Sequence, residues 1–141
     1  MSDKQNRIVY VVDDDDGVRE SLSALLESVG IETRTFASAE SSLKAIEMQA
    51  PACMLVDVRM PGISGLELQR LLQQRRRQVP VVMITGHGDV AMAVRAMKDG
   101  AIDFLEKPFN DQELIELVQA CQKRGLEAEQ QRTRQQEALY R

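Results

Sequence analysis

Two kinds of apolar pattern alternate along this chain of 141 residues. Short runs rich in β-branched residues predict strands. The most apolar of them, at 55–56 and 81–84, lack the polar alternation of a sheet with one solvated face. Such runs are typical of strands buried on both faces of a parallel sheet. The predicted strands are Arg7–Val12, Glu32–Phe36, Ala52–Asp57, Val81–Thr85 and Ala101–Leu105.

Segments of helical period separate and follow these strands. The first runs from Val18 to Val29, and Gly30 is placed to end it. Ser38 or Ser41 is placed to cap the second, which is the weakest of the predicted helices. The apolar faces of the later helices are Leu43 and Ile46; Leu68, Leu71 and Leu72; Val90, Val94 and Met97; and Leu114, Leu117, Val118 and Cys121.

This alternation predicts an α/β fold with a doubly wound, five-stranded parallel sheet and five helices, of the flavodoxin-like kind. Right-handed crossovers and short connections favour the strand order 2-1-3-4-5. In such sheets ligands bind beyond the carboxyl ends of the strands, at the switch point between strands 1 and 3.

Acidic residues stand on both sides of that predicted switch point. Asp13 to Asp16 follow the first strand and Asp57 ends the third. Carboxylates crowded at a strand end repel one another unless a cation or hydrogen bonds compensate. A solvated acidic turn is the alternative interpretation, and it suits Asp15 and Asp16, because aspartate is a favoured helix cap. For Asp13, Asp14 and Asp57 we expect a metal or phosphate site.

Composition and charge narrow the class of protein. The formal net charge of −4 gives no electrostatic reason to expect nucleic-acid binding by this chain. Cys53 and Cys121 lie far apart in apolar stretches without zinc-site spacing, so buried, reduced thiols are expected. The polar start of the chain and the lack of a long apolar run predict no signal peptide and no membrane span, and hence a cytoplasmic protein.

The composition changes near the end of the chain. Residues 1–123 read as one domain, whereas residues 124–141 are rich in Gln, Glu and Arg and too polar to build a core. Helix propensity there is high apart from Gly125. We therefore predict a helical linker leading elsewhere, or a dimer contact.

Four motifs, taken together, identify a family resemblance that covers about residues 7–123. They resemble the receiver domain of two-component response regulators, a CheY-like fold, and Thr85 to Val90 and Asp103 to Phe109 look like its FixJ-type subfamily. The motifs are Val11-Val12-Asp13-Asp14-Asp15, Val56-Asp57-Val58-Arg59-Met60-Pro61-Gly62-Ile63-Ser64-Gly65, Ile84-Thr85-Gly86 and Glu106-Lys107-Pro108-Phe109.

The resemblance implies a role for each residue of the site. Asp57 would accept a phosphoryl group from a phosphohistidine of a sensor histidine kinase, forming an acyl phosphate. Lys107, aimed by a cis Lys107-Pro108 bond, would pair with Asp57 and then with the phosphoryl oxygens. Thr85 would be the switch hydroxyl, and Phe104 the aromatic residue that rotates inward, with a buried core aromatic as its alternative. The implied Mg²⁺ ligands are Asp13, Asp14, Asp57 and the backbone carbonyl of Arg59.

The resemblance also implies how such a protein works. The chain would not be an enzyme in its own right, but would catalyse its own phosphorylation and slow dephosphorylation. Phosphorylation would promote homodimerisation through the face made by the fourth helix, fifth strand and fifth helix. DNA would be bound only by a LuxR-type helix-turn-helix output domain outside this chain, which would then be a piece of a longer transcription regulator.

Two alternative functions, and the role of His87, remain open at this point. A stand-alone regulator or phosphorelay shuttle would act by protein binding alone. A Mg²⁺-dependent phosphohydrolase with an aspartyl nucleophile is the other alternative, since Asp13 and Asp15 form the bare DxD pattern. His87, the only histidine, is either an exposed loop residue, which we favour, or an acid or base near the phosphoryl group.

Overall fold

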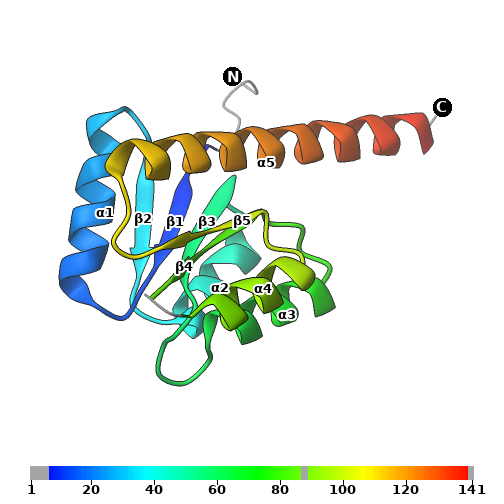
Figure 1. Cartoon of the computed structure of the whole chain (residues 1–141). Coiled ribbons are helices and arrows are strands. Elements are labelled where there is room, and N and C mark those ends of the chain that lie inside the picture. Colours follow the sequence, from blue (N-terminus) through cyan, green and yellow to red (C-terminus); the bar gives the residue numbers. More distant parts are fainter. Residues whose placement is uncertain (1–6, 87–88, 140–141) are drawn as a thin grey trace.

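The computed structural model describes residues 7–86 and 89–139 and shows a central parallel sheet between two layers of helices (Figure 1). Each predicted strand is confirmed to within two residues at either end. In chain order the elements are β1 (Val9–Val12), α1 (Asp16–Ser28), β2 (Thr33–Phe36), α2 (Ala39–Met48), β3 (Cys53–Asp57), α3 (Gly65–Gln74), β4 (Val81–Thr85), α4 (Val90–Lys98), β5 (Asp103–Glu106) and α5 (Asp111–Leu139).

The sheet has the predicted order, β2-β1-β3-β4-β5, and every pairing between neighbours is parallel. Successive residues of β1 enter opposite halves of the core. Val9 and Val11 pack with α1 and α5, whereas Tyr10 and Val12 pack with α2 and α3. This burial on both faces explains why β1, β3 and β4 read as continuous apolar runs.

Helix α4 packs differently from the sequence prediction. Ala93 and Ala96 are fully buried, whereas the predicted apolar face of Val90, Val94 and Met97 is exposed. Small side chains let the helix backbone lie close to the sheet, so the larger residues on the other side of α4 face outward. An apolar helical spacing alone does not reveal which side of the helix is covered.

The two cysteines correct another prediction. Cys53 and Cys121 are fully buried, as expected, but they form a disulfide with a Cα–Cα distance of 5.6 Å instead of two reduced thiols. Cys53 begins β3 and Cys121 lies on α5, 68 residues later. Their separation in sequence concealed a contact that the fold creates by laying α5 across the start of β3.

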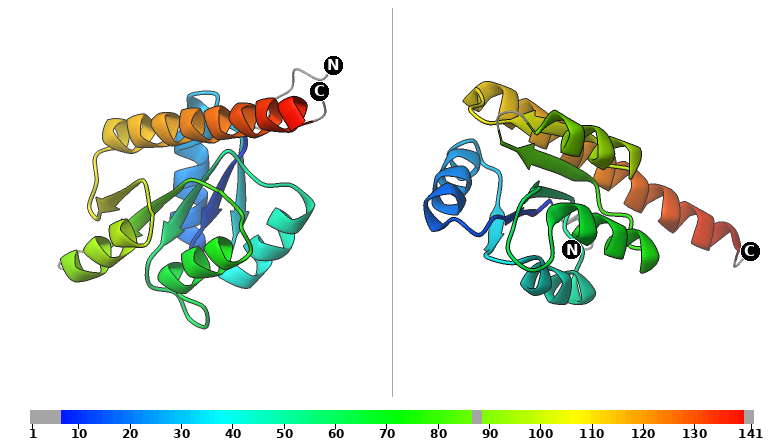
Figure 2. Two further views of the ribbon diagram at one scale, coloured as in Figure 1. Left: turned by 90° about the vertical axis from the view of Figure 1, so that its right-hand side faces the viewer. Right: turned by 60° about the horizontal axis from the view of Figure 1, so that its bottom comes forward.

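Helix α5 continues well past the sheet (Figures 1 and 2). Where it crosses the start of β3, a Cβ on Gly125 would lie 2.1 Å from the backbone oxygen of Ala52. Nearby, the side-chain amide of Gln122 donates to the backbone oxygen of Arg7 at 2.7 Å. Gly125, a poor helix former by propensity, is therefore required for close packing. No helix among the described residues is both long and apolar enough to cross a membrane.

Replacing Gly125 with alanine is expected to destabilise the fold by about 1–3 kcal/mol, the usual cost of overpacking. The clash with the Ala52 backbone outweighs the gain of about 1 kcal/mol in helix propensity. Urea unfolding measures the difference. Gly17→Ala is the matched control, because the added Cβ meets only the Asp15 carboxylate, at 3.3 Å. A Gly125→Ala protein as stable as the wild type would contradict this account of the packing.

Candidate functional site

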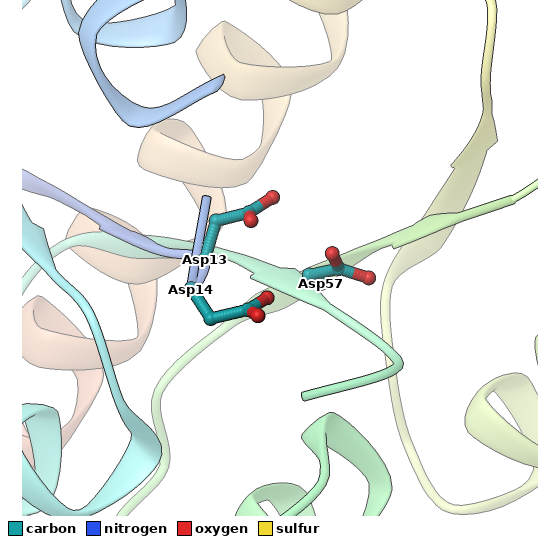
Figure 3. Close-up of side chains that lie close together, drawn as sticks. All are labelled: Asp13, Asp14 and Asp57. Carbon is teal, nitrogen blue, oxygen red and sulfur yellow. The ribbon is translucent and has the colours of Figure 1, made fainter. Parts of the chain in front are cut away.

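Three carboxylates meet at the carboxyl ends of β1 and β3 (Figure 3). These strands are neighbours, with Val12 paired to Val56, so Asp13 and Asp57 follow directly at adjacent strand ends. One ligand atom from each of Asp13, Asp14 and Asp57 lies within 4.8 Å of the others. The structure thus brings together the acids that the sequence assigned to one site, at the predicted switch point.

Asp13 is the buried member of this cluster, with 1% of its surface exposed. Its backbone N–H donates to the carbonyl of Phe36 in β2 at 3.1 Å, and its Oδ1 accepts from the N–H of Asp15 at 2.9 Å. Its Oδ2 is buried and has no hydrogen-bond partner among the described residues. An orphaned carboxylate oxygen beside two further carboxylates fits a hard divalent cation, which takes oxygen ligands.

The electrostatics of Asp13 agree with that fit. Burial raises the pKa of Asp13 to about 6, and the neighbouring Asp57 adds to the effect. The N–H of Asp15 and the ammonium of Lys107 act in the opposite direction, lowering the pKa of Asp13, but they do not compensate for burial. The cluster is therefore poised to take up positive charge, as a proton or as a metal ion.

Lys107 brings one positive charge to the acids. Its Nζ lies 3.7 Å from Asp57 Oδ2 and 3.9 Å from Asp13 Oδ2, so it is an ion-pair partner of both, beyond hydrogen-bonding distance. The Lys107-Pro108 peptide bond is cis, as the resemblance implied. The backbone N–H of Lys107 donates to the carbonyl of Thr85 at 2.8 Å, which joins the end of β4 to the loop after β5.

The two predicted switch residues occupy different environments. Thr85 is buried at the end of β4, one strand away from Asp57. Phe104, on the edge strand β5, is 37% exposed, which excludes the alternative of a buried core aromatic in this state. His87 lies outside the described residues.

The remaining two aspartates of the acidic run serve the helix, as expected. Asp15 is the N-cap of α1, and its Oδ1 accepts from the backbone N–H of Val18 at 3.0 Å. Asp16 is the first residue of that helix. Ser38 likewise caps α2 by accepting from the N–H of Ser41, which decides between the two predicted caps.

Sequence reasoning missed one feature of the site, an ion pair beside the acids. The backbone N–H of Arg59 donates to Asp57 Oδ1 at 3.1 Å, while its guanidinium donates to both carboxylate oxygens of Asp89. Arg59 and Asp89 are 30 residues apart. No local pattern signals such a pair, although both residues lie within recognised motifs.

The geometry agrees with a comparison of the chain with known families. Residues 9–119 match the model of the response regulator receiver domain. The chain therefore belongs to the response regulator receiver domain family.

Individual members of that family are similar to the chain over most of its length. It is 44% identical over 123 residues to the response regulator protein TodT of Pseudomonas putida, covering 87% of this chain and 54% of TodT. It is 52% identical over 119 residues to the transcriptional regulatory protein FixJ of Azorhizobium caulinodans, covering 84% of this chain and 56% of FixJ. The chain thus spans about half the length of these relatives.

A solved structure gives the same result for the fold. The response regulator StyR superposes with a TM-score of 0.87 at 44% identity, covering 94% of this chain and 67% of that chain. At that identity the likeness extends to the sequence as well as to the fold.

Replacing Asp13 with asparagine is expected to stabilise the metal-free protein at pH 7.5 by about 2 kcal/mol, because it removes a buried charge. The pKa of Asp13 is raised from 3.8 to about 6 on folding, so its ionised form opposes folding above pH 6. The advantage of the variant should shrink as the pH falls from about 6 to about 4. Urea unfolding across this range measures it.

Adding Mg²⁺ should reverse this order by stabilising the wild type and not the variant. Asp99→Asn, which removes a partly exposed acid outside the cluster, serves as the control and should still respond to Mg²⁺. Equal stabilisation of Asp13→Asn and wild type by Mg²⁺ would contradict the metal site.

Proposed function

We propose that this chain accepts a phosphoryl group on Asp57 from the phosphohistidine of a sensor histidine kinase. The observation that carries the proposal is the convergence of Asp13, Asp14, Asp57 and Lys107 at one strand edge in a member of the receiver family. In the transfer, a carboxylate oxygen of Asp57 forms a bond to phosphorus. The bond from phosphorus to the donor nitrogen breaks, and its electron pair stays with the imidazole.

Magnesium is the cofactor that this arrangement supports. Asp13, Asp14 and Asp57 would hold it, with the backbone carbonyl of Arg59 as a further ligand. The bound ion would offset the repulsion among the acids and neutralise charge on the transferring phosphoryl group. Lys107 already lies close enough to Asp57 to pair with a phosphoryl oxygen there.

Thr85 and Phe104 would carry the conformational change that follows phosphorylation. The hydroxyl of Thr85 would donate to a phosphoryl oxygen and draw the end of β4 inward. Phe104, exposed in the present state, would rotate into the space left behind. The carbonyl of Thr85 is already tied to the N–H of Lys107, so movement at β4 is transmitted to the loop after β5.

The phosphohydrolase alternative is disfavoured by Asp15. A DxD nucleophile motif needs both carboxylates in the site, but the Asp15 side chain caps α1 and lies outside the acidic cluster. The receiver mechanism accounts for the same residues without a second acid in that position. We therefore infer a phosphoacceptor that catalyses its own phosphorylation and slow dephosphorylation, rather than an enzyme with a separate substrate.

A groove beside the acids offers a docking surface for the kinase. A cavity of about 640 Å³ lies between α1 and the loop from β5 to α5. Its walls are apolar at Val18, Leu22 and Leu25 and at Pro108 and Phe109, and Asp15 and Lys107 lie at its edge. An apolar groove lined by Lys107, the ion-pair partner of Asp57, suits an amphipathic helix that presents a phosphohistidine.

The effect of phosphorylation would be passed to other proteins through the outward face of α4 and β5. Val90, Val94 and Met97 on α4 and Phe104 on β5 are large apolar residues exposed to solvent. Such a patch is typical of a protein interface. We infer homodimerisation through the α4–β5–α5 face on phosphorylation.

The names of the relatives, and the half of their length that this chain does not cover, suggest what the whole protein controls. We infer a receiver domain over residues 1–123 and a helical linker over 124–141, in which α5 continues without a break to Leu139. DNA would be bound by an output domain beyond this chain, which would make the whole protein a cytoplasmic transcription regulator. A stand-alone regulator acting through protein binding is the second candidate, and it shares the same phosphorylation chemistry.

Acetyl phosphate with Mg²⁺ is expected to add one phosphoryl group to the wild type, releasing acetate, and none to Asp57→Asn. Intact-mass spectrometry measures the added phosphoryl group. Asp99→Asn is the control and should be labelled like the wild type, since its carboxylate pairs with Arg70 outside the cluster. Equal labelling of Asp57→Asn and wild type would refute the assignment.

Replacing Val94 with aspartate is expected to abolish the dimer that acetyl phosphate and Mg²⁺ induce in the wild type. A charge at this exposed position would have to be buried in the interface without a partner, at a cost of several kcal/mol. Sedimentation velocity with and without acetyl phosphate measures the change. Val29→Asp is the matched control, because Val29 and Val94 are each 45% exposed and Val29 is the C-cap residue of α1. A wild type that stays monomeric under both conditions would contradict the dimer.

A further inference from the structure

The side chain of Arg59 joins the loop after Asp57 to the start of α4. Its Nε donates to Asp89 Oδ2 at 2.8 Å and its Nη2 donates to Asp89 Oδ1 at 2.9 Å. This two-point geometry is the most directional pairing that a guanidinium and a carboxylate can make. The pair connects the loop after β3 to the segment before α4, both at the carboxyl edge of the sheet.

Asp89 is also placed to cap α4, but its side chain does not do so. It is the N-cap residue of α4, a position where aspartate normally accepts from an N–H of the first turn. Its carboxylate makes no such capping hydrogen bond, and each of its oxygens instead accepts one hydrogen bond from Arg59. The first turn of α4 thus lacks a side-chain cap from Asp89 while the ion pair is formed.

Both ends of the pair connect to the phosphorylation site. At one end, the backbone N–H of Arg59 donates to Asp57 Oδ1. At the other end, the backbone N–H of Asp89 donates to the carbonyl of Gly86 at 3.1 Å, and Gly86 follows Thr85. A group added to Asp57 therefore acts directly on the backbone of one partner, and movement of Thr85 acts on the other.

We propose that Arg59 and Asp89 are positioning residues that hold the start of α4 in its unphosphorylated arrangement. A phosphoryl group on Asp57 would compete with Asp89 for the guanidinium, because phosphate oxygens are strong acceptors for arginine. Asp89, once released, can cap α4 instead. The carboxylate thus has two alternative partners, and the charge on Asp57 selects between them. This proposal rests on the proposed phosphorylation of Asp57.

The solvent exposure of the Arg59–Asp89 pair sets how large an effect to expect when the pair is broken. The side chains of Arg59 and Asp89 are 66% and 20% exposed, so solvent screens the pair. Exposed pairs change an equilibrium by up to about fivefold, and good bidentate geometry favours the upper part of that range. Breaking the pair should therefore raise the population of the active arrangement by about two- to fivefold.

The test compares Asp89→Asn, Arg59→Gln and the double variant. Asparagine is as good an N-cap as aspartate, so the first substitution removes the ion pair without removing the capacity to cap. The first measurement is amide hydrogen exchange in α4 without any phosphodonor. The second is the rate of phosphorylation by acetyl phosphate with Mg²⁺. We expect each single variant to change both rates by about two- to fivefold, with the double variant no different from the singles.

Asp99→Asn is the matched control, because it removes the exposed Arg70–Asp99 pair at the other end of α4. It should leave the phosphorylation rate unchanged. Unchanged α4 exchange in Asp89→Asn, or additive effects in the double variant, would overturn the proposal. Altered exchange with an unchanged phosphorylation rate would overturn the coupling to Asp57. Because exchange is measured without a phosphodonor, it still tests the pair if Asp57 proves not to be the phosphoacceptor.

Discussion

The repulsion among three carboxylates at one strand edge is the constraint on which the rest of this structure depends. Asp13 is buried beside Asp57, and one of its oxygens has no hydrogen-bond partner among the described residues. A fold holds such a group only where positive charge is at hand or can be bound. Lys107 supplies part of that charge from the loop after β5, and a divalent cation would supply the rest.

The parallel sheet makes this crowding possible. Because β1 and β3 are adjacent and parallel, their carboxyl ends emerge at the same edge, where burial on both faces holds them rigidly. The acids cannot move apart without disturbing the core of both layers. Positive charge at this edge relieves their repulsion, so a bound cation is favoured over the metal-free state.

The packing of α4 against the sheet decides which of its side chains reach the outer surface. Two buried alanines hold the helix against the sheet, so its larger apolar residues face outward beside Phe104. Contacts at the start of α4, including the ion pair from Asp89 to Arg59, link this helix to the loop that follows Asp57. A helix held by small side chains and a few polar contacts is well suited to shift by small amounts, because little large-residue packing is disrupted.

Most of the fold and the members of the acidic cluster could be predicted from the sequence. β-branched runs predicted the strands, and the position of Asp13, Asp14 and Asp57 at strand ends predicted a common site, because parallel topology allows few arrangements. Local chemistry also predicted that Asp15 or Asp16 would cap a helix, and Asp15 does so.

Only the tertiary structure decided which contacts form between distant segments. Four features depend on residues or surfaces that no local pattern relates. They are the exposed face of α4, the Cys53–Cys121 disulfide, the need for glycine at position 125 and the Arg59–Asp89 pair. Sequence periodicity records whether a residue suits a helix or a strand. What lies against its side chain is settled by the packing of the whole chain, since burial depends on elements far away in sequence.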